Sequence, residues 1–498
     1  MNNIPINFYP EVKFLGLYFD NHLYWKAHIR HIKAKALKAL NLVKILAHTS
    51  WGADRNTLLK LYKTTVLPIL EYGSPIFSSA SESTLRMLDP VHNLGIRLAS
   101  GAFRSSPVQS LIVEAGELPL SYKFKITICR ALKIITSPTK TKDLFKNTDC
   151  FLNTNIIPSF PSRAKRLFNY YNMNDIRFFS FDKMIPPWII NSPQICTKLS
   201  TIPVNKNNNP IAMKQFALEH IKLHNHNHLY TDGSKDENGV GLAVYGNNIK
   251  IQSSLSNIAS VFTAELLAIK SALKIVMKNH LKEITIFSDS LSSINAIKSY
   301  SNKSNIVKEI KFILHEMKLK NISVTLCWIP SHIGLEGNEK ADIYAKEAKT
   351  FPISSELLPV EDYIRFSKSV IKDKWQNCWR ENFDNNKLRE IKDTVDPWPS
   401  SFQKDRRCSV ILTRLRIGHT RLTHGYLMSN PHNPIPMCNI CNVQITVKHI
   451  IMICPKYSTQ RNLLFRGKSF KDILSESDKF LFSNILKFLR FYDLLDQI

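Results

Sequence analysis

Four short segments decide the fold of the middle of this chain: LYTDGSK at 229–235, TAELLAI at 263–269, ITIFSDS at 284–290 and WIPSHIGLEGNEKAD at 328–342. Each segment contributes one acidic residue, and in chain order these are Asp232, Glu265, Asp289 and Asp342. Strand-like alternation and helix-like periodicity follow one another through the region, which predicts an α/β domain.

The first two segments predict a strand followed by a helix. Alternation through 229–232 favours a strand that carries Asp232 and ends at the turn residues Gly233 and Ser234. The next pattern has the helical period, with an apolar stripe made by Phe262, Leu266, Ile269, Leu273 and Val276. Small residues beside Glu265 would let this helix approach the strand closely.

The other two acids, Asp289 and Asp342, also lie next to predicted strands or helices. The pattern at 283–288 predicts a strand that delivers Asp289 at its carboxyl end, where α/β sheets usually hold their sites. Another strand at 322–328 leads through a loop to a helix with Asp342 near its start.

Carboxylates in this number suit hard divalent metal ions. Mg²⁺ prefers carboxylate and water oxygens, and two such ions can activate a water and hold the leaving oxygen of a phosphodiester. Taken singly, Glu265 has an ordinary explanation as a solvated helix charge, Asp289 as a helix cap and Asp342 as a first-turn dipole partner. Together the four acids indicate a metal site.

These motifs resemble type 1 ribonuclease H, in the version carried by Jockey-like non-LTR retrotransposons. The resemblance covers about 226–350 and implies a mixed five-stranded sheet flanked by helices. It also implies an endonuclease that hydrolyses the RNA strand of RNA–DNA hybrids with two Mg²⁺ ions, for which Mn²⁺ can substitute. Integrases of similar fold place their glutamate last, whereas here it is second.

The resemblance assigns a role to each residue. Asp232, Glu265, Asp289 and Asp342 match the catalytic metal ligands of the family. His332 matches its mobile-loop histidine, which aids proton transfer or product release. The alternative for His332 is a polar loop residue without a role in the chemistry.

The composition agrees with a nucleic-acid partner. The chain has 498 residues and a formal net charge of +27, and such a charge attracts phosphate backbones although it also favours solubility. No apolar run is long enough for a bilayer and no signal-peptide core is present, which predicts an intracellular protein of the nucleus or cytoplasm. Nine scattered cysteines argue against a secreted disulfide scaffold.

The first part of the chain, 1–135, predicts a basic helical region. An apolar stripe runs through Ile29, Ile32, Ala36, Leu40 and Val43, with basic residues on the other faces. The region resembles the reverse transcriptase thumb of the same elements. Polymerase palms hold their metals with an Asp-Asp pair, which is missing here, so we expect no DNA synthesis.

Two further stretches have weaker signals. Residues 136–225 are expected to form a connector, and the alternating His224, His226 and His228 either bind a metal or simply lead into the strand. Residues 351–430 predict a helical region, in which the segment around Arg406, Arg407, Arg414, Arg416 and Arg421 is a candidate phosphate-binding surface.

The tail, 431–498, contains a second candidate metal site. Cys438, Cys441, His449 and Cys454 have the spacing of a tetrahedral zinc shell, and four protein ligands would make its role structural. Buried cysteines beside a chance histidine are the alternative. The segment resembles the Cys/His tail that follows ribonuclease H in the same retroelements, and an amphipathic helical stretch ends it.

The sequence therefore predicts a retrotransposon-derived protein that cleaves RNA–DNA hybrids. The alternative is a non-catalytic, nucleic-acid-binding remnant of a retroelement polyprotein that lacks the polymerase palm.

Overall fold

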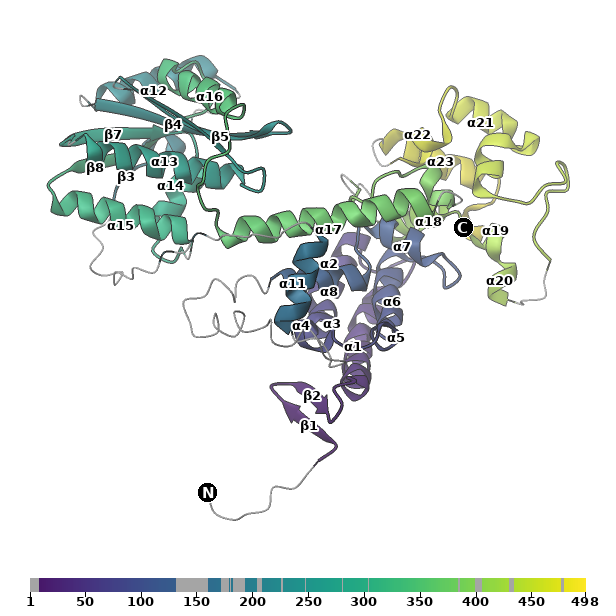
Figure 1. Ribbon diagram of the computed structural model, residues 1–498. Helices are drawn as coiled ribbons and strands as arrows, with labels where there is room; N and C mark the ends of the chain where they lie inside the picture. The colour runs from purple at the N-terminus through teal and green to yellow at the C-terminus, as the bar shows by residue number, and fades with distance from the viewer. Residues whose placement is uncertain are drawn as a thin grey trace, which may run out of the picture. The chain divides into compact units, whose positions relative to one another are not determined.

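The computed structural model describes residues 9–130, 160–171, 179, 181, 193–203, 208–224, 227–246, 248–279, 281–302, 304–383, 386–398, 405–429, 434–475 and 479–498. These residues fall into two compact units. The sheet unit comprises the described residues of 172–367, and the helical unit comprises those before 132, those of 160–171 and those from 368 onward (Figure 1).

The sheet unit is built on one mixed sheet of six strands. In spatial order they are β3 (Gln194–Cys196), β8 (Ser323–Trp328), β7 (Glu283–Ser288), β4 (Asn227–Asp236), β5 (Gly239–Gly246) and β6 (Ile249–Leu255). The pairs from β3 to β4 are parallel, while β4–β5 and β5–β6 are antiparallel. The mixed sheet confirms the predicted fold, with one strand more than the five expected.

The additional strand comes from the stretch expected to be a connector. β3 extends the parallel edge by pairing with β8, and Cys196 lies opposite Cys327 in the register. Helix α12 (Pro210–Lys222) also belongs to this unit and packs Met213 and Ala217 against Phe287.

Helices cover both faces of the sheet. α13 (Val261–Lys278), α14 (Leu291–Lys298) and α15 (Asn305–Leu319) lie on one side, and α12 and α16 (Glu336–Ala348) lie on the other (Figure 1). The predicted stripe of α13 is buried except for Phe262, which is partly buried. The periodicity of this helix was therefore a sound guide to its core face.

Two glycines allow helices to approach the sheet closely. A Cβ at Gly233 would lie 2.6 Å from the backbone nitrogen of Glu265, and one at Gly241 would lie 2.1 Å from the carbonyl oxygen of Ala345. Only a residue without a side chain fits at either point. Gly233 therefore sets the distance between β4 and the helix that carries Glu265.

Two local expectations were wrong. β4 does not end at Gly233 and Ser234 but continues to Asp236, because those residues pair with Leu242 and Gly241 in the hairpin with β5. Asp342 lies in the middle of α16 and not near its start, since the helix begins within the expected loop at Glu336.

The helical unit begins with a hairpin, β1 (Glu11–Phe14) and β2 (Leu17–Asp20). Its N-terminal helices are α1 (Lys26–Leu46), α2 (Arg55–Thr65), α3 (Leu67–Glu71), α4 (Ser74–Phe77), α5 (Glu82–Arg86), α6 (Asp89–Ser100), α7 (Val108–Ala115), α8 (Leu120–Cys129) and α11 (Phe160–Tyr170). The predicted stripe of α1 is buried throughout. A helical N-terminal region is thus confirmed.

The rest of this unit follows the sheet in the chain. Its helices are most of α17 (Val360–Asn382), then η4 (Lys387–Glu390), α18 (Arg406–Ile417), α19 (Arg421–His424), α20 (Tyr426–Ser429), η5 (His449–Ile453), η6 (Pro455–Tyr457), α21 (Ser458–Leu464), α22 (Phe470–Leu474), α23 (Lys479–Phe491) and η7 (Leu495–Gln497). Trp375 and Trp379 of α17 share a core with the N-terminal helices.

The structure corrects the expected phosphate-binding surface for Arg406 and Arg416, which are buried. Arg407 and Arg421 of the same segment are exposed. The Arg406 guanidinium is buried and donates to the carbonyl oxygens of Leu98, Ala99 and His48. Arg414 donates to the carbonyl oxygen of Gly101. These side chains satisfy the ends of N-terminal helices, so their charge is structural.

Among the residues that the structure describes, no helix combines the length and the apolar character needed to span a bilayer.

Candidate active site

Strand register brings the two strand acids together. β4 and β7 are parallel neighbours, with Thr231 opposite Ser288. One residue further along each strand, at the carboxyl end of β7, lie Asp232 and Asp289. Side chains one step past paired residues of parallel strands lie next to each other, so the sheet itself holds these carboxylates in place.

Glu265 completes a cluster of three. Single carboxylate oxygens of Asp232, Glu265 and Asp289 all lie within 4.8 Å of one another. Asp232 and Glu265 are each only 6% exposed. The Oε2 atom of Glu265 is buried and has no hydrogen-bond partner among the described residues. A buried acceptor of this kind is costly unless something satisfies it.

Burial and mutual repulsion act on the protonation of this cluster. Burial, followed by the charges of Asp289 and Asp342, raises the pKa of Asp232 to about 7. Burial, followed by Asp232 and Asp289, raises the pKa of Glu265 well above its ordinary value. Like charges in a dry site resist ionisation together, and a divalent cation would remove that resistance. The donor set therefore fits hard metal ions.

Asp342 lies in a neighbouring group on α16. Ligand atoms of Asp342, His332 and Glu339 lie within 4.8 Å of one another. Lys346, one turn along the helix, donates to Oδ2 of Asp342 at 2.7 Å. The charge of Asp342 contributes to the raised pKa of Asp232, which links the two groups electrostatically.

His332 is exposed in the loop before α16. Its φ of 53° is in the left-handed region, which is uncommon for a residue other than glycine. The next residue but one, Gly334, donates its backbone N–H to Oε1 of Glu339 at 3.1 Å. A contact between loop and helix thus sets the position of the imidazole beside Asp342.

Sequence reasoning missed Asn338. This side chain is 2% exposed and donates from Nδ2 to Oδ2 of Asp289 at 3.2 Å, while its own Oδ1 has no partner among the described residues. Asn338 precedes Asp342 by four residues, so both lie on one face of α16. That spacing was the available signal, since a polar residue one turn from a site acid faces the same point.

The tail cysteines also come together. The Sγ atom of Cys454 lies 3.8 Å from that of Cys438 and 3.9 Å from that of Cys441, and a ligand atom of His449 is within 4.8 Å of all three. A tetrahedral zinc ion with Zn–S bonds near 2.3 Å requires sulfur atoms about 3.8 Å apart. The neighbouring His449 imidazole lowers the pKa of Cys438 to about 6, which favours the thiolate. These four residues fit a zinc shell.

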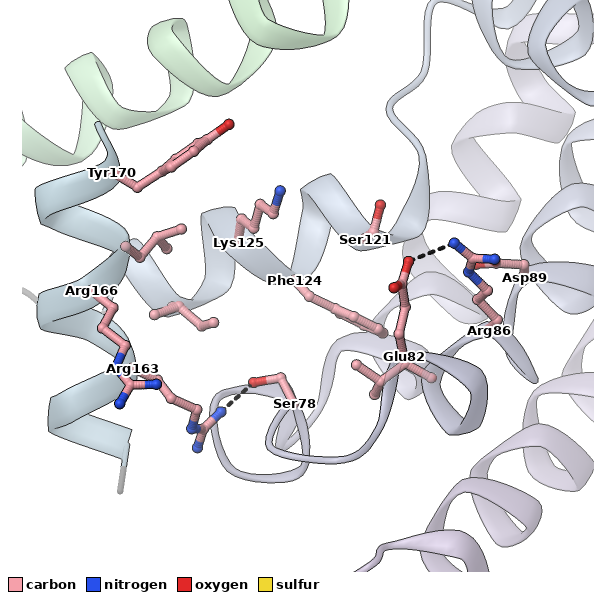
Figure 2. A pocket seen from close by; sticks show the side chains of 13 residues that line it. Ser78, Glu82, Arg86, Asp89, Ser121, Phe124, Lys125, Arg163, Arg166 and Tyr170 are labelled. Atoms are coloured by element: carbon pink, nitrogen blue, oxygen red, sulfur yellow. Dashed lines mark hydrogen bonds and ion pairs between the residues drawn. The ribbon is translucent and has the colours of Figure 1, made fainter. Parts of the chain in front are cut away.

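A hollow of about 790 Å³ opens in the helical unit between α5, α8 and α11. Figure 2 shows that Arg163 of α11 points toward Ser78, to which it donates at 2.6 Å, and that Arg86 pairs with Glu82. Phe124 contributes to an apolar wall. None of the groups of His, Cys, Asp and Glu that could hold a metal ion among the described residues lies in this hollow.

The geometry and the order of the acids define a class. Residues 213–350 match the family model described as RNase H. That part of the chain is therefore an RNase H domain, a mixed sheet flanked by helices with Asp232 and Asp289 side by side at the carboxyl end of β7.

Two relatives show which proteins part of this chain resembles. One is a protein of Nasonia vitripennis described as a retrovirus-related Pol polyprotein from type-1 retrotransposable element R1 4, to which the chain is 26% identical over 125 residues. This alignment covers 25% of the present chain and 32% of the Nasonia protein. The chain is 25% identical over 125 residues to the corresponding R1 polyprotein of Bradysia coprophila, over 24% of this chain and 12% of that one. The alignments thus span a third or less of either relative. About a quarter of the chain is similar to the Pol polyproteins of two type-1 retrotransposable elements.

Proposed function

We propose that the sheet unit hydrolyses the RNA strand of RNA–DNA hybrids, with two Mg²⁺ ions as cofactors. The observation that carries the proposal is the cluster of Asp232, Glu265 and Asp289, two of them buried, with an unsatisfied Glu265 oxygen at its centre. An RNase H domain of a retrotransposon supports the same reaction.

The protein residues have distinct tasks in this proposal. Asp232, Glu265, Asp289 and Asp342 would hold the two ions, which lower the pKa of a water and neutralise the leaving oxygen. Asn338 orients the Asp289 carboxylate. Lys346 holds Asp342 in place until a cation competes for it. His332, exposed beside Asp342, would accept or deliver a proton, or help the product to leave.

The substrate follows from the chemistry of nucleic acids. A basic chain attracts any phosphate backbone, so binding alone does not select RNA. The 2′-hydroxyl and the wide minor groove of the RNA-containing duplex distinguish a hybrid from DNA. We therefore propose that DNA duplex binds by charge but is not cut.

A cleavage assay on four substrates tests the proposal. The full chain is incubated with an RNA–DNA hybrid, a DNA duplex, an RNA duplex and single-stranded RNA, each labelled in one strand, with and without Mg²⁺. Cleavage of the RNA strand of the hybrid, dependent on Mg²⁺ or Mn²⁺, is the expected result. Equal cleavage of the DNA duplex would indicate another nuclease class, and binding without any cleavage would leave a nucleic-acid-binding remnant.

We also propose that the Cys/His tail holds structural zinc. The shell of Cys438, Cys441, His449 and Cys454 has no open position for a substrate, so its contribution would be folding energy. Hydrogen exchange should show that Cys441→Ser loosens residues around 437–456, while hybrid cleavage survives. Unchanged exchange in this segment would contradict the proposal.

A further inference from the structure

A second cluster of thiols and imidazoles lies in the sheet unit and shares no residue with the acidic cluster. Cys196 on β3, His220 on α12 and Cys327 on β8 offer ligand atoms that are all within 4.8 Å of one another. Sγ of Cys196 lies 3.2 Å from Nε2 of His220. Cys196 and His220 are 24 positions apart, and Cys327 lies more than a hundred positions further along the chain, so tertiary folding brings it to the other two.

His224 lies beside this group of three and is the candidate for a fourth ligand. Its Nε2 atom lies 3.6 Å from Sγ of Cys327, and its ring centroid is 5.1 Å from that of His220. His220 lies in the last turn of α12 and His224 just beyond the end of this helix, and their rings make an edge contact. The predicted alternating trio is therefore not the relevant grouping: His228 packs on Phe287 and contacts the backbone oxygen of His224, and His226 lies outside the described residues.

Two sulfur–nitrogen distances agree with a tetrahedral shell of mixed ligands. With Zn–S near 2.3 Å and Zn–N near 2.0–2.1 Å, a sulfur and a nitrogen on one zinc ion are about 3.5 Å apart. The Cys196–His220 and Cys327–His224 pairs, at 3.2 and 3.6 Å, lie within a few tenths of an ångström of that value. Two thiolates and two imidazoles also have the softness that favours zinc over Mg²⁺.

The surroundings suit a buried structural ion. Cys327 is fully buried and His220 is 9% exposed, among apolar residues that include Leu199, Met213 and Ile329. Burial, with Cys196 as a smaller cause, raises the pKa of Cys327 to about 12. Uncharged thiols and imidazoles are also stable in a buried apolar environment without a metal. The distances between the ligand atoms, and not the raised pKa, therefore indicate the metal site.

We propose that Cys196, His220, His224 and Cys327 bind a zinc ion that fastens β3 and α12 to the parallel edge of the sheet. β3 has only three residues and pairs with β8 alone. A strand of this length is weakly held by its hydrogen bonds, and a metal bond from Cys196 would add the missing constraint.

Zinc stoichiometry of the full chain tests the proposal. The protein is produced with zinc, exchanged into excess Mg²⁺ so that the acidic cluster retains none, and analysed for zinc per chain. Cys196→Ser and His224→Gln should each remove one equivalent, and Cys378→Ser, which alters a cysteine outside both clusters, should remove none. Cys441→Ser should remove a separate equivalent from the tail.

A second readout identifies the ligands. With Co²⁺ in place of zinc, the charge-transfer absorption of thiolate–cobalt bonds should weaken in Cys196→Ser and stay unchanged in Cys378→Ser. Zinc content and absorption equal to the parent in both Cys196→Ser and His224→Gln would overturn the proposal. A parent mass two hydrogens lower under non-reducing conditions, with a Cys196–Cys327 crosslinked peptide, would overturn it in favour of a disulfide.

Discussion

The protonation of Asp232 is strongly affected by its surroundings in the proposed site. Its ordinary pKa is 3.8, and in the folded protein burial and two neighbouring aspartates raise it to about 7. Between these values the unfolded chain releases a proton that the folded protein keeps. Unfolding therefore releases a proton in this window, and stability falls as pH rises.

We predict that the sheet unit without Mg²⁺ loses roughly 2–4 kcal/mol of stability between about pH 4 and pH 7, because each pKa unit corresponds to about 1.4 kcal/mol. Asp232→Asn should flatten this dependence, and added Mg²⁺ should oppose the loss. Hydrogen exchange of β4 and β7 amides measures it. Asp236→Asn, which alters an exposed acid at the end of the same strand, should keep the slope of the parent. If stability changes equally with pH in the parent and both variants, the raised pKa of Asp232 is refuted.

His332 belongs to the same scale but has a different task. If its imidazole transfers protons or assists product release, His332→Ala should slow steady-state cleavage by about 10- to 100-fold while the Mg²⁺ requirement stays the same. His22→Ala, an exposed histidine of the helical unit, serves as the control. A parent-like rate at every pH would show that His332 is an ordinary loop residue.

At the scale of elements, α16 does more than carry Asp342. It presents Asn338 to Asp289, so the helix and the central strand fix each other at the site. We predict that Asn338→Ala raises the Mg²⁺ concentration needed for half-maximal cleavage several-fold, because the Asp289 carboxylate loses the group that orients it. The measurement is the cleavage rate as a function of Mg²⁺ concentration. The exposed Glu336→Gln of the same helix should leave the titration unchanged, and an unchanged titration for Asn338→Ala would contradict the orienting role.

The elements also show what the sequence could predict. The strands and helices that carry the acids can be predicted from the sequence, because alternation and helical period are patterns among residues close together in the chain. The sixth strand was not predictable in this way: β3 is three residues long and exists because β8 offers an edge. The start of α16 was predicted too late, and Asp342 therefore too near it, because the polar residues of the loop continue into the first turn of the helix.

At the scale of the whole molecule, the basic composition proved an incomplete guide. Arg416 is 1% exposed and lies 3.4 Å from Oε1 of the fully buried Glu114, which also pairs with Arg55 at 2.9 Å. Arg55 is 59 and Arg416 is 302 positions from Glu114, so no local pattern revealed that this positive charge is internal. Part of the net charge of +27 is therefore structural and not available to phosphates.

We predict that Glu114→Gln destabilises the helical unit by about 3–5 kcal/mol, because it leaves two buried guanidinium groups without their carboxylate. Glu82→Gln removes an exposed pair with Arg86 and should cost less than about 1 kcal/mol. Urea unfolding followed by hydrogen exchange in α2, α7 and α18 measures both. A similar cost for the two variants would show that the buried network contributes little.

The rate of hybrid cleavage with and without the Asp232 carboxylate tests the central claim most directly. Single-turnover cleavage of a labelled RNA–DNA hybrid in Mg²⁺ is compared for the parent, Asp232→Asn and Asp236→Asn, with folding of each verified by circular dichroism. We predict at least a 1,000-fold loss, about 4 kcal/mol of transition-state stabilisation, for Asp232→Asn and parent-like cleavage for Asp236→Asn. An Asp232→Asn protein that cuts the hybrid as fast as the parent would contradict the assignment of this site.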